Sequence, residues 1–146
     1  MNANSKYLDN AGTIQGNGNC YEEFSYIAGI VAFASSIQLF HNFVNIGIVK
    51  GGDYQFVGGI AAYFSGSQIG ICSNSGIIEG GQNSCGGLIG YLGNGHIKSC
   101  INTNWIETNA SNRGSIIGYV NAGSFDSCYY DNQMSLYGAV NNMDYS

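Results

Sequence analysis

Residues 85–112 read CGGLIGYLGNGHIKSCINTNWIETNASN, and the same pattern recurs along most of the chain. Shifted by 28 residues toward the N-terminus, it overlays VGGIAAYFSGSQIGICSNSGIIEGGQNS at 57–84. Shifted toward the C-terminus, it overlays RGSIIGYVNAGSFDSCYYDNQ at 113–133. A further copy lies at 27–56, and half a copy, LDNAGTIQG, lies at 8–16. Fixed periods of about 20 to 50 residues are typical of stacked architectures, in which each unit buries its apolar face against its neighbours.

Each copy holds three short apolar segments, separated by turns that contain Gly, Ser or Asn. The segments are rich in Ile, Val, Tyr and Phe and are too short for helices, which favours β-strands. We therefore predict an all-β fold, a parallel β-helix (β-solenoid), with about 28 residues and three short strands per coil and roughly four to five coils. Equivalent residues of successive coils would then form rows along the axis, about 4.8 Å apart.

The predicted organisation is a single β-solenoid domain over residues 1–146, because no compositional break suggests a linker. Its parts are a half-repeat at 8–16, a loop at 17–26, repeats at 27–56, 57–84, 85–112 and 113–135, and a tail at 136–146. The tail contains no amphipathic helix that would cap the last coil. We therefore expect open strand edges at both ends.

Three rows of equivalent residues follow from the repeat. Asparagines form one row at a corner, where stacked amides can bond one another and the turn backbone; they are Asn10, Asn45, Asn74 and Asn102. An aromatic row consists of Phe33, Tyr63, Tyr91 and Tyr119. The third row consists of Phe43, Cys72, Cys100 and Cys128.

The aromatic row has two interpretations: internal packing, or an exposed stripe able to stack on sugar rings. The thiols of the third row share their slot with Phe43, which indicates buried, reduced packing residues rather than metal ligands. Cys20 and Cys85 lie outside this slot and are the candidates for a disulfide, although an odd count of five cysteines leaves at least one thiol unpaired. The chain has no CxxC motif, and we expect no metal site.

Composition argues against several classes of function. Charged residues make up 9% of the chain, the net charge is -5, and only four Lys and Arg are present. So few positive charges can neither neutralise a nucleic acid nor hold an anionic membrane. Apolar runs fall well short of the roughly 20 residues that span a bilayer, and residues 1–10 do not resemble a secretion signal. We expect no nucleic-acid partner, no membrane insertion and no cofactor.

One column of charged residues has a spacing relevant to sugar cleavage. Lys50, Glu79 and Glu107 share a repeat slot, with Gln15 before them. The two glutamates would be neighbours about 4.8 Å apart, which resembles the carboxylate pair of a retaining glycosidase. Register alone, however, places two glutamates side by side on the outside of a solenoid. We therefore expect no enzymatic activity and keep a polysaccharide-active β-helix enzyme as a remote alternative.

The segment GGLIGYLGNGHIKSCINTN, with the variants VGGIAAY and GSIIGYV, resembles the GLUG-type repeat of bacterial surface and secreted proteins. SCYYDNQMS at 127–135 is similar to the phrase with which such arrays often finish. The resemblance covers roughly residues 27–135 and departs from the pattern where Ala32 and Ala62 replace the second Gly. It implies a β-solenoid in adhesin-like material, extracellular or at the cell surface, and brings no catalytic residues.

The functional expectation is structural. We expect a self-assembling extracellular subunit whose open ends meet those of other copies head to tail, in a filament, fibril or matrix. The alternative is an adhesin or carbohydrate-binding module of a larger cell-surface protein, in which the aromatic row and exposed amides contact glycans. The sequon Asn109-Ala110-Ser111 makes Asn109 a candidate glycosylation site in a loop.

Overall fold

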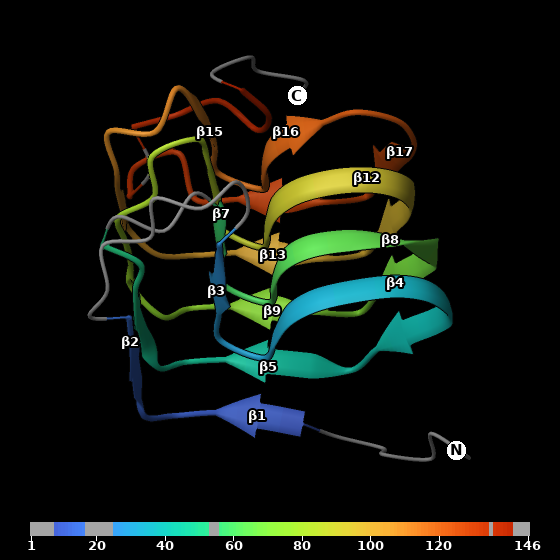
Figure 1. The fold of residues 1–146 in the computed structure, drawn as a ribbon, viewed down its shortest axis with the longest axis horizontal. Coiled ribbons are helices and arrows are strands. Elements are labelled where there is room, and N and C mark those ends of the chain that lie inside the picture. The colour runs from blue at the N-terminus through green and yellow to red at the C-terminus, as the bar shows by residue number, and fades with distance from the viewer. Residues whose placement is uncertain (1–7, 17–24, 53–55, 135, 142–146) are drawn as a thin grey trace.

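The computed structural model describes residues 8–16, 25–52, 56–134 and 136–141. These residues form a stack of β-strand coils in which every strand pair is parallel (Figure 1). The described part of the chain contains no helix, and so none that could cross a membrane. The predicted β-solenoid is confirmed.

The strands form four sheets that run along the axis of the stack. Sheet A contains β1 (Leu8–Asn10), β5 (Phe43–Asn45), β9 (Ser73–Asn74), β13 (Ile101–Asn102) and β18 (Tyr129–Tyr130). Sheet B contains β2 (Thr13–Gln15), β6 (Ile48–Lys50), β10 (Ile78–Glu79) and β14 (Ile106–Glu107). Sheet C contains β3 (Tyr26–Ala28), β7 (Phe56–Gly58), β11 (Ser84–Gly86) and β15 (Asn112–Gly114). Sheet D contains β4 (Val31–His41), β8 (Ala61–Gly70), β12 (Ile89–Lys98) and β16 (Ile117–Val120), and β17 (Ser124–Asp126) also pairs with β12.

Each complete coil passes through four sheets, so the predicted three strands per coil were wrong. The two segments predicted on either side of the Ser- or Asn-containing turn form one long strand in β4, β8 and β12, and its register shifts mark a β-bulge. Two sheets were missed. The strands of sheet A fall on the third-row slot and the asparagine corner, and those of sheet C are divided by the predicted repeat boundaries at 57 and 85, which lie inside β7 and β11. Tyr26 likewise belongs to β3 rather than to the predicted loop, and residues 17–24 of that loop lie outside the described residues.

The corner that leads into sheet A has the same backbone conformation in four coils. The residue before the third-row slot has a positive φ in each of them: 65° at Asn42, 53° at Ile71, 55° at Ser99 and 50° at Ser127. Residues other than Gly rarely adopt this conformation, and β-branched Ile least readily. Its recurrence shows that the register of the coil, rather than residue preference, sets this corner.

The C-terminal segment begins a fifth coil. The amide N of Ser115 donates to the carbonyl O of Gly138 (2.8 Å), and those of Ile116 and Ile117 donate to the carbonyl O of Ala139 (2.9 and 3.1 Å). The predicted tail at 136–146 therefore covers part of the last coil, and its residues 142–146 lie outside the described residues. At the opposite end, β1 to β4 pair on one side only within the described ranges.

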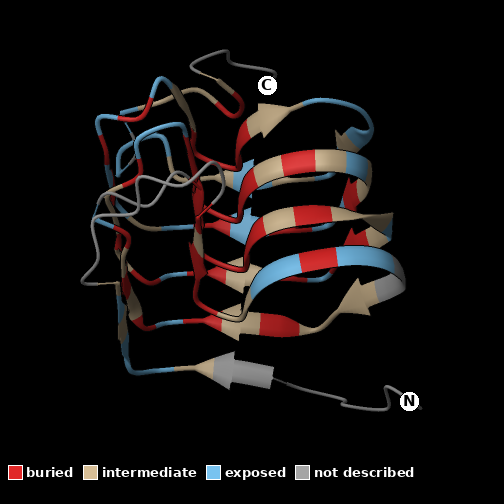
Figure 2. Ribbon diagram, viewed as in Figure 1, coloured by how far each residue is buried: buried red, intermediate tan, exposed pale blue. Residues whose placement is uncertain are grey.

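Two apolar cores fill the coil, and a third, small cluster of Ala28, Phe56 and Ala62 packs against Tyr26 and Tyr91. Figure 2 shows how the buried segments recur from coil to coil. The larger core lies between sheets A and D, and Phe64 is its largest fully buried side chain. The smaller core lies between sheets B and C and includes Val57, Ile78 and Cys85. Both cores are rows of equivalent residues, so each coil buries its apolar side chains mainly against the coils before and after it.

Candidate functional site

The asparagine row forms a continuous chain of hydrogen bonds at the corner between sheets A and B. Nδ2 of Asn10 donates to Oδ1 of Asn45 (2.8 Å), Asn45 donates likewise to Asn74 (2.6 Å), and Asn74 to Asn102 (2.7 Å). Asn45 and Asn74 are 0% exposed, and the row ends where Tyr130 is in register with Asn102. Because these buried amides bond one another, they offer nothing to a ligand and serve as structure.

The aromatic row lies along sheet D outside the main core and is only partly exposed. Ring centroids are 4.7 Å apart for Phe33 and Tyr63, 5.5 Å for Tyr63 and Tyr91, and 5.2 Å for Tyr91 and Tyr119, all in stacked geometry. Burial raises the pKa of Tyr91, as do its neighbours Tyr119 and Tyr63. The rings therefore cover one another's faces and present mainly edges to the adjoining cleft of about 340 Å³.

The thiol row is a packing row. Each thiol donates to the carbonyl O two residues before it, at 3.2 Å for Cys72, Cys100 and Cys128, and all three are free thiols. Cys72 and Cys100 are buried with Phe43 in the larger core. A hydrogen bond with Cys100 lowers the pKa of Cys72, whereas the hydrogen bond with Cys100, together with burial, raises the pKa of Cys128.

Cys85, one of the two disulfide candidates, is a free thiol with 0% exposure. It occupies a row of its own, in register with Val57, which is in turn in register with Ile27. This row faces the smaller core, so the thiol takes the place of an aliphatic side chain. Its proposed partner Cys20 lies outside the described residues.

Burial raises the pKa of Cys85 from 9.0 to about 12, against a smaller opposing effect of a hydrogen bond with Thr108. Between these values only the unfolded state loses the proton, so stability is intact below about pH 9 and falls as the pH rises toward 12. In Cys85→Val we expect the free energy of unfolding to fall less steeply between pH 9 and 12, by about 1 kcal/mol per pH unit. Urea unfolding of both proteins across this range measures it, and equal slopes would contradict it.

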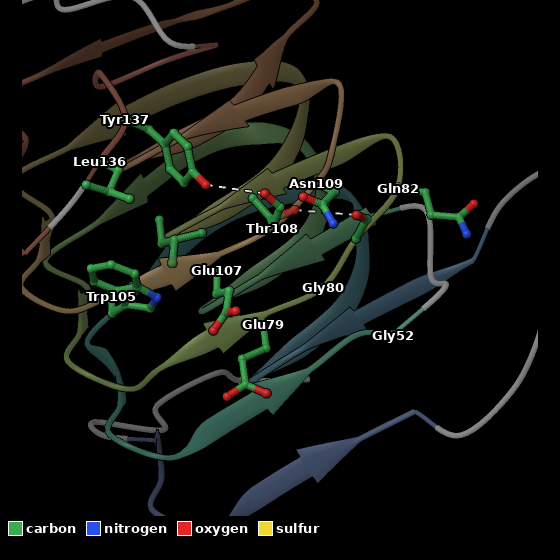
Figure 3. Close-up of a pocket in the computed structure, with 12 residues that line it drawn as sticks. Gly52, Glu79, Gly80, Gln82, Trp105, Glu107, Thr108, Asn109, Leu136 and Tyr137 are labelled. Atoms are coloured by element: carbon green, nitrogen blue, oxygen red, sulfur yellow. Dashed lines mark hydrogen bonds between the residues drawn. The ribbon is translucent and has the colours of Figure 1, made fainter.

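A cleft of about 750 Å³ lies at the corner between sheets B and C (Figure 3). Glu79 and Glu107 are in register on β10 and β14, as predicted, and both line the cleft. Nζ of Lys50 lies 3.2 Å from Oε2 of Glu79, whereas the described residues contain no ion pair to Glu107. The exposed Trp105, which precedes Glu107 on the same wall, was not singled out from the sequence. Its place two residues before Glu107, and so on the same side of an extended segment, was the signal that could have found it.

The structure also brings together a Ser, a His and an Asp that the sequence analysis did not connect. Nδ1 of His96 lies 2.7 Å from Oγ of Ser124, and Nε2 lies 2.9 Å from Oδ2 of Asp126. The nitrogens are exchanged relative to a serine-protease triad, in which Ser contacts Nε2 and Asp contacts Nδ1. His96 on β12 is in register with Ser124 on β17, and Asp126 lies two residues after Ser124 on the same strand. The 28-residue offset from His96 to Ser124 was the signal that could have found the cluster. We interpret the cluster as a surface hydrogen-bond network.

The described residues hold no group of three or more His, Cys, Asp and Glu side chains able to bind a metal. Asn109 is exposed and lines the cleft that contains Trp105. Comparisons with protein-family models, curated proteins and solved structures found no match for this chain.

Proposed function

We propose that this chain is a structural β-solenoid subunit that assembles end to end with copies of itself, at the cell surface or outside the cell. The supporting observation is the N-terminal end of the stack, where β1 to β4 pair on one side only within the described residues. These strands contain neither Lys nor Pro, residues with which natural edge strands resist pairing with other chains. A stacked copy would gain backbone hydrogen bonds in several sheets at once.

Backbone donors on this edge point outward. The carbonyl O of Gly12 accepts a hydrogen bond from the amide N of Ile48 on β6, at 3.0 Å. In a trans peptide the N–H of the next residue points the opposite way. The N–H of Thr13 is therefore directed at the open side of β2, where a strand of another copy can accept it.

The aromatic row supports the same proposal. Phe33 has a row neighbour on one side only and is 51% exposed, the most exposed ring of the four. A ring from a second copy can extend the stack at this end, in the same geometry as within the chain. The proposed location, outside the cell or at its surface, rests only on the resemblance to GLUG-type repeats.

We expect the molar mass in solution to rise with concentration and Thr13→Pro to lower it, because Pro removes the outward N–H at the first residue of an edge strand, where Pro is tolerated. Multi-angle light scattering after size exclusion measures this, and electron microscopy shows whether the species are filaments. Thr13→Ala is the matched control, because it changes the same exposed side chain and keeps the backbone N–H that points at the open side of β2. A wild type that stays at 15.5 kDa at high concentration would end the proposal.

The alternative, a carbohydrate-binding module that uses the aromatic row, is less well supported. Sugar rings stack on free aromatic faces, and the middle rings at Tyr63 and Tyr91 have both faces occupied by row neighbours. The enzyme alternative is also weaker, because Glu79 is paired with Lys50 and half exposed, and an exposed ion pair of this kind has a structural explanation.

A further inference from the structure

The cleft at the corner of sheets B and C combines an apolar wall with the carboxylate of Glu107, to which the described residues make no ion pair. Trp105 is 36% exposed and Leu136 is 71% exposed, and both line it. Sheet B ends at β14 within the described residues, so no further strand of this sheet stacks above Trp105. The indole is thus placed to receive a flat apolar surface from a ligand.

The polar wall of the cleft has a definite charge. The lining contains two carboxylates, Glu79 and Glu107, and Nζ of Lys50 lies 3.2 Å from Oε2 of Glu79. One negative charge is therefore left over, on the side of Glu107. Figure 3 shows Glu107 and Trp105 on the same side of the cleft, with Glu79 one strand below.

From this geometry we infer that the cleft binds a sugar ring that carries no negative charge. The apolar face of a pyranose stacks on the Trp105 indole, and its hydroxyl groups, or a protonated amine, donate hydrogen bonds to the Glu107 carboxylate. Acidic sugars are repelled by the same carboxylate. The volume of about 750 Å³ lies within the range of roughly 300–1,000 Å³ that is usual for small-molecule sites and leaves room for a short oligosaccharide.

The inference is independent of end-to-end assembly and differs from the predicted use of the aromatic row. It also bears on the sequon, because Asn109 lines the same cleft. A glycan attached to Asn109 would cover the site, so free-ligand binding requires this residue to be unmodified. The protein for the test is therefore produced in cells that do not N-glycosylate.

Trp105 is the only tryptophan of the chain, so fluorescence excited at the red edge of the indole absorption, where the 11 tyrosines do not absorb, reports on this cleft. We titrate the full chain with trisaccharides of glucose, glucosamine, N-acetylglucosamine and galacturonic acid to millimolar concentration. The expected result is a saturable change in emission with at least one of the first three and none with the acidic trisaccharide. No change with any of them would overturn the inference, and binding of the acidic trisaccharide would overturn the role of Glu107.

To identify the residues that bind the sugar, we measure the affinity of variants for the trisaccharide that binds most tightly, by isothermal titration calorimetry. We expect Trp105→Ala and Glu107→Gln each to weaken binding about tenfold. Asp126→Asn, which removes one negative charge on sheet D, and Tyr63→Ala in the aromatic row should leave affinity unchanged. Circular dichroism verifies that each variant keeps its β-structure. Loss of binding in Tyr63→Ala with retention in Trp105→Ala would move the site to the aromatic row and overturn the proposal.

Discussion

Asn74→Ala is expected to lower the free energy of unfolding by about 3–5 kcal/mol. Oδ1 of Asn74 accepts from Nδ2 of Asn45 at 2.6 Å, and its Nδ2 donates to Oδ1 of Asn102 at 2.7 Å and to the carbonyl O of Gly76 at 3.0 Å. Alanine makes none of these bonds. Polar groups of Asn45, Asn102 and Gly76 therefore lose a partner at a site where Asn74 is 0% exposed. Each buried polar group that loses its partner costs about 1–3 kcal/mol, which accounts for the size of the effect.

Asn10→Ala is the matched control, because Asn10 occupies the same slot at the end of the row and is only half buried. Water can replace its contacts there, and we expect a loss of about 1 kcal/mol. Urea-induced unfolding, followed by circular dichroism, compares the two midpoints. Equal losses in both variants would show that the row contributes only local turn contacts and not a continuous chain.

Phe64→Ala is expected to cost about 3–5 kcal/mol. Phe64 is 0% exposed on β8 and belongs to the core between sheets A and D, where it packs near the ring of Phe40 at 6.0 Å. Truncation leaves a cavity in a place where parallel strands on both sides hold the backbone, so the surroundings cannot collapse to fill it. The loss is a large share of the roughly 5–15 kcal/mol by which domains are stable.

Phe33→Ala removes a ring of the same size from the same sheet. Phe33 is 51% exposed and stacks on Tyr63 at 4.7 Å, outside the main core. We expect a loss of about 1 kcal/mol, from the ring contact alone. Thermal unfolding of the two variants under identical conditions makes the comparison, and similar melting temperatures would mean that the coil is filled differently from what the structure shows.

The asparagine row and the buried apolar rows, such as that of Phe64 with Ala34 and Leu92, have different physical roles in the same stack. Apolar side chains such as Phe64 provide most of the driving force, but an apolar row tolerates a slip of one coil by an even number of residues, because the same face stays buried. The amide chain through Asn45, Asn74 and Asn102 does not, because a shifted coil leaves buried donors and acceptors without partners. We therefore expect the asparagines to define the register that the apolar rows stabilise.

Several details of the coil were beyond sequence reasoning. The division into four strands depends on bulges in β4, β8 and β12, which keep one strand continuous through a turn-like sequence. The row of Cys85 was not visible as a pattern in the sequence, because its partners Val57 and Ile27 differ from it in chemistry. The Trp105 cleft needs Leu136, which reaches it only because the chain starts a fifth coil.

The sequence by itself determined which residues stack on which: the 28-residue period places Tyr63, Tyr91 and Tyr119 in one row and Glu79 beside Glu107. This holds for any cross-section of the coil, because stacking depends only on spacing along the chain. Only the tertiary structure decided which side of the backbone each row faces. The side is set by bulges and by contacts between sheets of the same coil, and neither leaves a periodic signal in the sequence.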